Sequence, residues 1–284
     1  MDFLLFFYKI NLASEGRKTF FDIHKRAGDS VFANEVRAAR EAFDKSDDAF
    51  AEEIAAFAER ENLQVEYLNL YLYVVFAEEA FAVFKRRNIS EEIFYSTFFD
   101  ITIVCRVCEQ KCGVYGIPQD IYRDWLRLPL MGKLYRLGRL QFELIESEYD
   151  LPEYGLRRGD TCLSTHIPRY EPLDNSLCEE SYAAARVFFK EKFGIERCVF
   201  FCDSWLLHPW LREDLPADSR IRVFSEKFSL LKVTESREEV LNWIFPFMDG
   251  TDVSSLPGDT FLRCAAIARM LENRPLGSAI GVRE

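Results

Sequence analysis

The chain has 284 residues, of which 49% are hydrophobic and 15% aromatic, and its formal net charge is −11. That much apolar surface excludes an intrinsically disordered chain, and the length suits one large domain or two ordinary ones. The acidic balance argues against a broad electrostatic interface with nucleic acid or with an anionic membrane. We therefore expect a globular protein that has neither partner.

The first residues contain an apolar run, Phe3–Tyr8, but Asp2 has the wrong charge for a signal peptide and no small-residue cleavage site follows. The apolar stretches near Tyr67–Ala77 and Ile93–Cys105 are interrupted by polar residues. Both are shorter than the roughly 20 apolar residues that a membrane span needs. We predict a cytoplasmic protein that does not cross a membrane, with its eight cysteines as reduced thiols.

Apolar residues recur three and four positions apart between about Val31 and Cys112, which predicts a bundle of amphipathic helices. Within this stretch, Ser90 precedes two glutamates and predicts a helix start. Gly113 predicts the end of the last helix of the bundle.

Cys105, Cys108 and Cys112 fall on one face of a predicted helix. Thiolates spaced in this way can hold zinc or an iron–sulfur cluster, but a closed site needs a fourth ligand and usually a second paired motif. The sequence has no second C-x2-C motif. We interpret these cysteines as core residues and predict no metal site.

We place a domain boundary after this bundle, giving a helical N-terminal domain of residues 1–116 and a second domain of residues 117–284. Pro118 suits the first turn of a short helix and Pro129 should end it. One side of this helix is apolar and consists of Ile121, Tyr122 and Trp125.

The pattern then changes from helical to strand-like. Arg139–Leu144 and Thr161–Ile167 alternate polar and apolar residues, which predicts two strands that pair antiparallel. A helix over Ser176–Phe193 follows, opened by a capping box that starts at Ser176 and closed by Gly194. Cys198–Cys202 is a continuous apolar run, typical of a central strand buried on both faces.

The rest of the chain adds an extended segment near Phe228–Val233 and helices near Glu238–Phe245 and Asp259–Glu272. Strand, strand, helix and buried strand in this order predict a layered arrangement of helices on a sheet. The predicted fold class is therefore α+β: a helical N-terminal domain followed by a mixed-sheet domain.

Several short motifs, in this order and spacing, resemble a bacterial protein family. They are Leu134–Glu143, His166–Pro168, Pro172–Leu173 and Cys202–Leu207. The family comprises acyltransferase domain-containing proteins with a helical N-acyltransferase-type N-terminal domain and a GNAT-like C-terminal domain. The resemblance covers roughly Trp125–Gly281.

The resemblance implies an acyl-CoA donor, acetyl-CoA or another, and direct transfer of the acyl group to an amine on a small molecule or a polypeptide. In GNAT enzymes the donor's diphosphate binds where a strand and loop meet a helix N-terminus, a place that suits anions. The matching element here is the loop that leads into the Ser176–Phe193 helix. It supplies four candidate donor-binding residues: Ile167, Arg169, Asn175 and Ser176.

This chain departs from the family pattern in several places. Glu171 stands where glycine is expected, and His208 stands where an acidic residue is usual. The glycine signature of ordinary GNAT enzymes, which makes room for a diphosphate, is missing. Asp174 and Glu179 also place carboxylates at the same helix start, where they either repel a diphosphate or complement the helix dipole.

Direct acyl transfer needs a base for the amine and an acid for the leaving thiolate. His166, at the end of its predicted strand, is the candidate base, and a structural role in fixing the following proline loop is its alternative. Asp203 and Ser204 follow the buried strand, where α/β proteins place site residues. Cys202 is a candidate nucleophile, with packing as its alternative.

Two further pairs have open roles. Arg136 and Arg139 either bind an anionic substrate or occupy a solvated strand face, and we prefer the second role. Trp205 and Trp210 either line a pocket or belong to the core, and we prefer the core.

Two hypotheses for the whole protein follow. The first is an acyl-CoA-dependent N-acyltransferase. The second is a GNAT-like fold without catalysis that serves as a binding or scaffold protein. The sequence specifies neither the acyl group, the acceptor, the oligomeric state nor the pathway.

Overall fold

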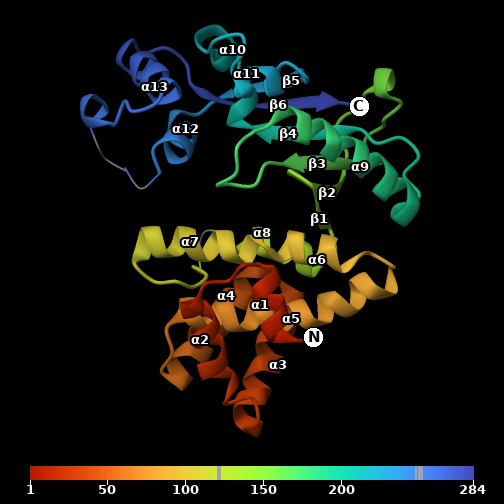
Figure 1. Ribbon diagram of the computed structural model, residues 1–284, viewed down its shortest axis with the longest axis vertical. Helices are drawn as coiled ribbons and strands as arrows, with labels where there is room; N and C mark the ends of the chain where they lie inside the picture. Colours follow the sequence, from red (N-terminus) through yellow and green to blue (C-terminus); the bar gives the residue numbers. More distant parts are fainter. Residues whose placement is uncertain (120–122, 247, 249–251) are drawn as a thin grey trace. The chain divides into compact units, whose positions relative to one another are not determined.

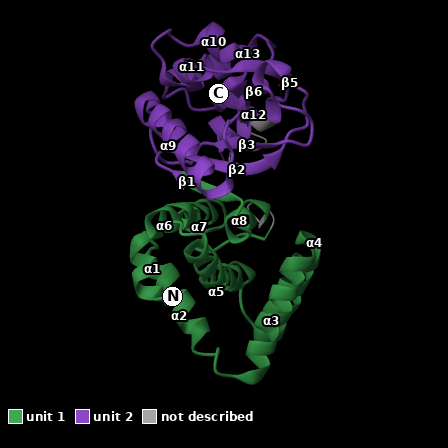
Figure 2. Cartoon of the chain, turned by 90° about the vertical axis from the view of Figure 1, so that its right-hand side faces the viewer, with its two compact units in different colours: residues 1–136 green, residues 137–284 purple. Residues whose placement is uncertain are grey.

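The computed structural model describes residues 1–119, 123–246, 248 and 252–284. The predicted positions of Ile121 and Tyr122 lie outside the described residues. The chain divides into two compact units, Met1–Arg136 and Leu137–Glu284, coloured green and purple in Figure 2. The first is helical and the second is built on a sheet, which confirms the predicted α+β class.

Helices make up the first unit. Their bounds are α1 (Phe3–Lys9), α2 (Ser14–His24), α3 (Ser30–Lys45), α4 (Asp47–Glu61), α5 (Val65–Arg86), α6 (Glu91–Phe98), α7 (Asp100–Cys112) and α8 (Arg123–Leu130). Figure 2 shows α5 in the middle of this unit, with α1 and α2 on one side and α3 and α4 on the other. Because α5 is apolar on nearly all sides, it suits this central position.

α5 is also the one helix, within the described residues, that is long and apolar enough to cross a membrane. Asn69 is one of the polar residues that interrupt this apolar stretch in the sequence. Asn69 is 2% exposed, and its Nδ2 donates to the Ile117 carbonyl at 3.1 Å. Of the most apolar window of α5, 61% is buried inside the protein, and the core helix of a globular unit passes the same test of length and composition.

The predicted helix signals in this unit hold. Ser90 caps α6, where its Oγ accepts a hydrogen bond from the Ile93 amide at 3.3 Å. Gly113 ends α7 in the left-handed conformation, with φ of 71°. Cys105 and Cys108 are buried, as predicted, whereas the core interpretation was wrong for Cys112, which is exposed at the end of α7. Burial raises the pKa of the Cys108 thiol to about 12.

The compact-unit boundary lies after Arg136, so the expected boundary after Gly116 falls inside the first unit. The physical reason is that the segment after Gly116 bonds back to the helices. The Ile117 amide donates to the Glu66 carbonyl at 3.0 Å, and Trp125 Nε1 donates to the Asp100 carboxylate at 2.7 Å. Pro129 lies inside α8 rather than beyond its end.

The chain forms a mixed sheet of strand order β1-β2-β3-β4-β6-β5, and β2 to β6 belong to the second unit. The strands are β1 (Leu134–Leu137), β2 (Leu140–Glu146), β3 (Thr161–His166), β4 (Phe200–Ser204), β5 (Ser229–Glu235) and β6 (Gly277–Arg283). β2 and β3 pair antiparallel, as predicted, and β3 and β4 pair parallel. β6, which the sequence analysis missed, pairs antiparallel with both β4 and β5.

Within the described residues, five helices lie between the strands of this sheet along the chain (Figure 1). They are α9 (Asn175–Phe193), α10 (Trp210–Asp214), α11 (Arg220–Ser225), α12 (Arg237–Ile244) and α13 (Phe261–Leu271). Of these, α9 and α12 contact strands. Short 3-10 turns lie at Pro152–Tyr154, Trp205–Leu207 and Val253–Ser255. Trp210 is fully buried in an apolar cluster with α12 and α13, and Trp205 packs on the same cluster, so both tryptophans have the predicted core role.

The start of α9 differs from the prediction. Asp174, not Ser176, is the N-cap, and its carboxylate accepts from the amides of Ser176 and Leu177 at 3.0 and 3.2 Å. The helix begins one residue earlier than expected because an aspartate carboxylate reaches two free amides at once. Gly194 closes the helix with φ of 68°, as predicted.

Candidate functional site

The two faces of the sheet carry different side chains. On one face, Phe142 and Phe200 pack against Tyr182 of α9, with ring centroids 5.5 and 4.9 Å from the tyrosine ring. On the other face, Cys162 and Phe201 belong to a separate apolar cluster. Because side chains alternate along a strand, the residues two positions beyond each of these share its face.

His166 therefore lies on the face opposite α9, at the end of β3, and the structure pairs it with Glu143 of β2. Its Nε2 is 2.9 Å from Glu143 Oε2. The two side chains are 28% and 19% exposed, so the pair is partly shielded from water but accessible. A carboxylate at this distance holds the imidazole ring in one orientation.

Asp203 of β4 shares that face, because it stands two residues beyond Phe201. β3 and β4 pair only at Leu163 with Phe200 and at Ser164 with Phe201, although both strands continue further. Asp203 is exposed, yet partial loss of hydration around its carboxyl raises its pKa, while the charge of Lys232 acts in the opposite direction. The structure thus places His166 and Asp203 on the same face, at the ends of neighbouring parallel strands.

Cys202 and Ser204 do not join this group. Cys202 is fully buried on the α9 face, and burial raises the pKa of its thiol far above the ordinary value. A thiol that stays protonated and out of contact with solvent is a poor nucleophile. Ser204 Oγ accepts from the Leu206 amide at 3.2 Å and so caps the short turn that follows β4. We therefore drop both residues from the catalytic candidates.

Arg139 holds the loop between β3 and α9. Its Nε donates to the Pro172 carbonyl at 2.8 Å and its Nη2 donates to the Glu171 carbonyl at 2.9 Å. Arg139 is 6% exposed, and Arg136 is 7% exposed with its guanidinium 5.7 Å from the Phe99 ring centre. The preferred interpretation of a solvated strand face was wrong for both arginines, because each is buried against protein groups.

The start of α9 is already occupied by side chains of the protein. The amides of Ser176 and Leu177 donate to the Asp174 carboxylate. Asn175 Nδ2 donates to the Arg220 carbonyl at 3.1 Å. Ile167, at the start of the loop, is half-buried. Of the four candidate donor-binding residues, Asn175 and the Ser176 amide thus have partners within the protein.

Arg169, the fourth candidate, lies in the middle of this loop and stacks on α12. Its guanidinium carbon is 4.0 Å from the centre of the Trp243 ring. Arg169 is half-buried, and Trp243 is 42% exposed. The stack joins the β3–α9 loop to a helix that is far away in the sequence.

Comparison with known proteins assigns the chain to a family. The profile of the GNAT-like C-terminal domain matches residues 134–283, and that of the N-acyltransferase N-terminal domain matches residues 1–132. The chain belongs to the family that joins an N-acyltransferase N-terminal domain to a GNAT-like C-terminal domain. Comparison with curated protein sequences gives no match.

Solved structures of similar proteins agree with this assignment. The GNAT-family chain is similar to an acyltransferase in complex with decanoyl-CoA and teicoplanin, at 26% identity and a TM-score of 0.68, over 77% of this chain and 66% of that one. A tryptophan-to-alanine variant of an acyltransferase in complex with octanoyl-CoA is 25% identical, with a TM-score of 0.68, over 78% of this chain and 67% of that one. This chain therefore spans about two thirds of the length of the first of these proteins.

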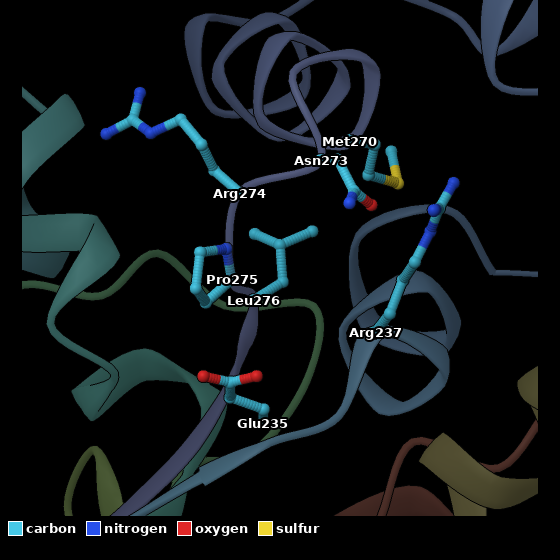
Figure 3. A pocket seen from close by; sticks show the side chains of 7 residues that line it. All are labelled: Glu235, Arg237, Met270, Asn273, Arg274, Pro275 and Leu276. Atoms are coloured by element: carbon cyan, nitrogen blue, oxygen red, sulfur yellow. The ribbon is translucent and has the colours of Figure 1, made fainter.

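A surface pocket of about 310 Å³ lies at the carboxyl end of β5 in the GNAT-like unit. Figure 3 shows Glu235 and Arg237 near Leu276, while Arg274 extends away from the other labelled side chains. Arg274 Nη2 pairs with the Asp214 carboxylate at 3.3 Å. None of the candidate catalytic residues lines this pocket, so it is separate from the His166 face.

Sequence reasoning missed two residues of the site, Glu143 and Trp243. Glu143 stands on the alternating strand β2, and the antiparallel register pairs His166 with Gln141, which lies two residues before Glu143 on the same face. The predicted pairing of these two strands is a signal that could have pointed to a carboxylate near His166. For Trp243 the sequence offered no such signal, because α12 lies far from the β3–α9 loop along the chain.

Proposed function

We propose that this GNAT-family protein is an acyl-CoA-dependent N-acyltransferase that acts by direct transfer. The observation that carries the proposal is the His166–Glu143 pair, at 2.9 Å, on an accessible face at the end of β3. A histidine beside a carboxylate at the end of a parallel strand is suited to proton transfer near a bound substrate. The similar acyltransferases with bound acyl-CoA supply the donor class.

The reaction needs one proton acceptor. The neutral amine nitrogen attacks the thioester carbonyl carbon, the carbon–sulfur bond breaks, and the products are an amide and the free thiol of CoA. With Glu143 ionised, Nε2 of His166 carries the proton that it donates to the carboxylate. His166 takes the amine proton while the Glu143 carboxylate holds its ring in place. The proton is finally passed to the leaving thiolate.

A medium-chain acyl group is the donor that we favour over acetyl. The sequence analysis named acetyl-CoA or another acyl-CoA, whereas the similar acyltransferases hold decanoyl-CoA and octanoyl-CoA. One of them also holds teicoplanin, so an amine on a small molecule is the acceptor that we favour over a polypeptide. A cytoplasmic location is part of the proposal, and its support is that all eight cysteines are free thiols.

One observation favours the second hypothesis, a binding protein without catalysis. The Asp174 carboxylate occupies two amides of the α9 start, which is the place where the resemblance located a diphosphate. Isothermal titration with acyl-CoA ligands decides between the two functions. We expect decanoyl-CoA to bind the purified protein with micromolar affinity in isothermal titration and acetyl-CoA to bind more weakly. An absence of heat with either ligand at millimolar concentration, together with an unchanged melting temperature, would favour the binding protein.

Variants then test the site. We expect His166→Ala to lower turnover, measured as release of CoA thiol in the presence of an amine acceptor, by about 100-fold with an unchanged melting temperature. Glu143→Gln should lower turnover by about tenfold or more, because it removes a charge-assisted hydrogen bond. Glu146→Gln, an exposed change of the same kind on the same strand, is the matched control and should act as wild type. A large fall in melting temperature with normal turnover would instead give His166 a structural role.

A further inference from the structure

The pocket at the carboxyl end of β5 carries two side chains of opposite charge. Neither the Glu235 carboxylate nor the Arg237 guanidinium forms an ion pair or a hydrogen bond with another described residue. The two do not pair with each other, although only Ser236 separates them in the chain. Arg274, which lines the same pocket, pairs instead with the Asp214 carboxylate at 3.3 Å. Within the described part of the chain, the pocket therefore presents one unpaired carboxylate and one unpaired guanidinium.

The two charges lie at opposite ends of the pocket, and apolar side chains lie between them. Figure 3 shows the Glu235 carboxylate at one end and the Arg237 guanidinium at the other, near the Asn273 amide. Leu276 lies between the two ends, and Met270 lies at the guanidinium end. Both apolar residues are buried and belong to the apolar cluster of α12 and α13. The pocket thus joins a negative end to a positive end along an apolar wall.

Backbone hydrogen bonds hold both walls of this pocket. The Ser236 amide donates to the Leu276 carbonyl at 2.9 Å, which fixes the turn between β5 and α12 against the start of β6. The Arg274 amide donates to the Arg269 carbonyl at 2.8 Å, just after Asn273, which takes the left-handed conformation with φ of 54°. Asparagine adopts that conformation more readily than most residues. Because the walls are already held in place, a ligand has little chain ordering to offset when it binds.

The chemistry of each end selects a different ligand group. Arg237 is the first residue of α12, where the helix dipole disfavours a cation, so its charge does not stabilise the helix. A guanidinium offers a fork of N–H donors that matches the two oxygens of a carboxylate. The Asn273 amide can add a further donor to the same group. The Glu235 carboxylate has only acceptors and suits an ammonium group.

We infer that this pocket binds an ω-amino acid, a small molecule with a carboxylate at one end, a protonated amine at the other and a short apolar chain between them. The carboxylate binds Arg237 and Asn273, the amine binds Glu235, and the chain lies on Leu276. The pocket volume of about 310 Å³ is at the lower end of the range of about 300–1,000 Å³ for small-molecule sites, which suits a ligand of this size. None of the candidate acyl-transfer residues lines the pocket, so the inference does not depend on the proposed function.

Titration of the full chain with 6-aminohexanoate tests the site. At low ionic strength, where exposed charges are least screened, we expect it to bind with a Kd of about 1 mM or below. Hexanoate lacks the amine, hexylamine lacks the carboxylate and glycine lacks the apolar chain. Each of these three should bind about fivefold or more weakly. Equal affinity for hexanoate and 6-aminohexanoate, or no heat with 6-aminohexanoate at about 10 mM, would overturn the inference.

Variants of the two charged residues locate each end of the ligand. We expect Arg237→Ala and Glu235→Gln each to weaken the binding of 6-aminohexanoate by about fivefold or more. Glu235→Gln should leave the binding of hexanoate unchanged, because hexanoate has no amine. Glu238→Gln and Arg158→Ala change exposed residues outside the pocket and are the matched controls, which should bind as wild type. Wild-type affinity for 6-aminohexanoate in both pocket variants would contradict the inference.

His166→Ala separates this pocket from the acyl-transfer face. We expect it to bind 6-aminohexanoate as tightly as wild type, because His166 does not line the pocket. A loss of binding in His166→Ala would place the ligand on the acyl-transfer face, and the inference would then be wrong. Since binding is measured without an acyl donor, a failure of the proposed acyl transfer does not change the result of this titration.

Discussion

Cys202 and Asp203 are neighbours in the chain, yet their side chains lie on opposite faces of β4. One is buried and the other is exposed to solvent. Cys202 faces α9 among aromatic rings, and burial holds its pKa far above the ordinary thiol value. Asp203 faces solvent with His166 and Glu143. The alternation of a strand therefore separates the candidate nucleophile from the candidate base.

Native-state alkylation tests this separation. With iodoacetamide at mildly alkaline pH, we expect rapid labelling of the exposed Cys112 and Cys264 and none of Cys202. The reason is that the thiolate is the reactive species and Cys202 is both protonated and covered. Peptide mass spectrometry reads out each site, and labelling in denaturant shows that every cysteine peptide is detected. Labelling of Cys202 as fast as Cys112 in the folded protein would show that its thiol is accessible and return it to the site.

At the scale of single residues, the sequence pattern identified site residues within one segment. It did not identify site residues that come together from two separate segments. His166 and Asp203 were identified because each ends a recognisable strand. Glu143 and Trp243 contribute through the register of β2 and through a stack on α12, neither of which follows from local pattern. Residues that become neighbours only through tertiary contacts cannot be identified from local sequence pattern alone.

At the scale of elements, the strongly patterned segments were predicted and the weakly patterned one was not. β2 and β3 alternate polar and apolar residues, and β4 has an apolar start, so each was found. β6 contains two glycines and a serine, a composition that is poor in strand-forming residues. Gly277 belongs there because an added Cβ would meet the Thr234 carbonyl at 1.9 Å. Close approach of β5 and β6 therefore selects glycine over a better strand former.

The start of α9 allows a direct test of the corrected cap. We expect Asp174→Ala to lower the free energy of unfolding by about 1 kcal/mol, because two amides lose their acceptor. Ser176→Ala should change it by only a few tenths of a kcal/mol, because the Ser176 side chain is not the cap. Urea denaturation of both variants measures the difference. A larger loss in Ser176→Ala than in Asp174→Ala would restore the capping box that the sequence suggested.

At the scale of the whole molecule, the chain forms two compact units. The boundary between them lies later in the chain than the sequence pattern predicted. Gly113 and Gly116 end the last strongly helical stretch, so a boundary there was reasonable from sequence. The structure keeps residues 117–133 with the helical unit, and the family profiles divide at the same region, matching residues 1–132 and 134–283. This segment contains the short helix α8, and its local pattern did not indicate that its buried side chains pack with the helices before it.

Two N-terminal fragments test which boundary is physical. We expect fragment 1–133 to unfold cooperatively and fragment 1–116 to be less stable by about 3 kcal/mol or more. The shorter fragment loses Ile117, which is fully buried and bonded to Glu66, and it leaves the buried carboxylate of Asp100 without its bond from Trp125. It also loses the carbonyl that accepts from Asn69. Urea denaturation followed by circular dichroism compares the two. Equal midpoints would mean that residues 117–133 add nothing to the helical unit, and the boundary would then belong after Gly116.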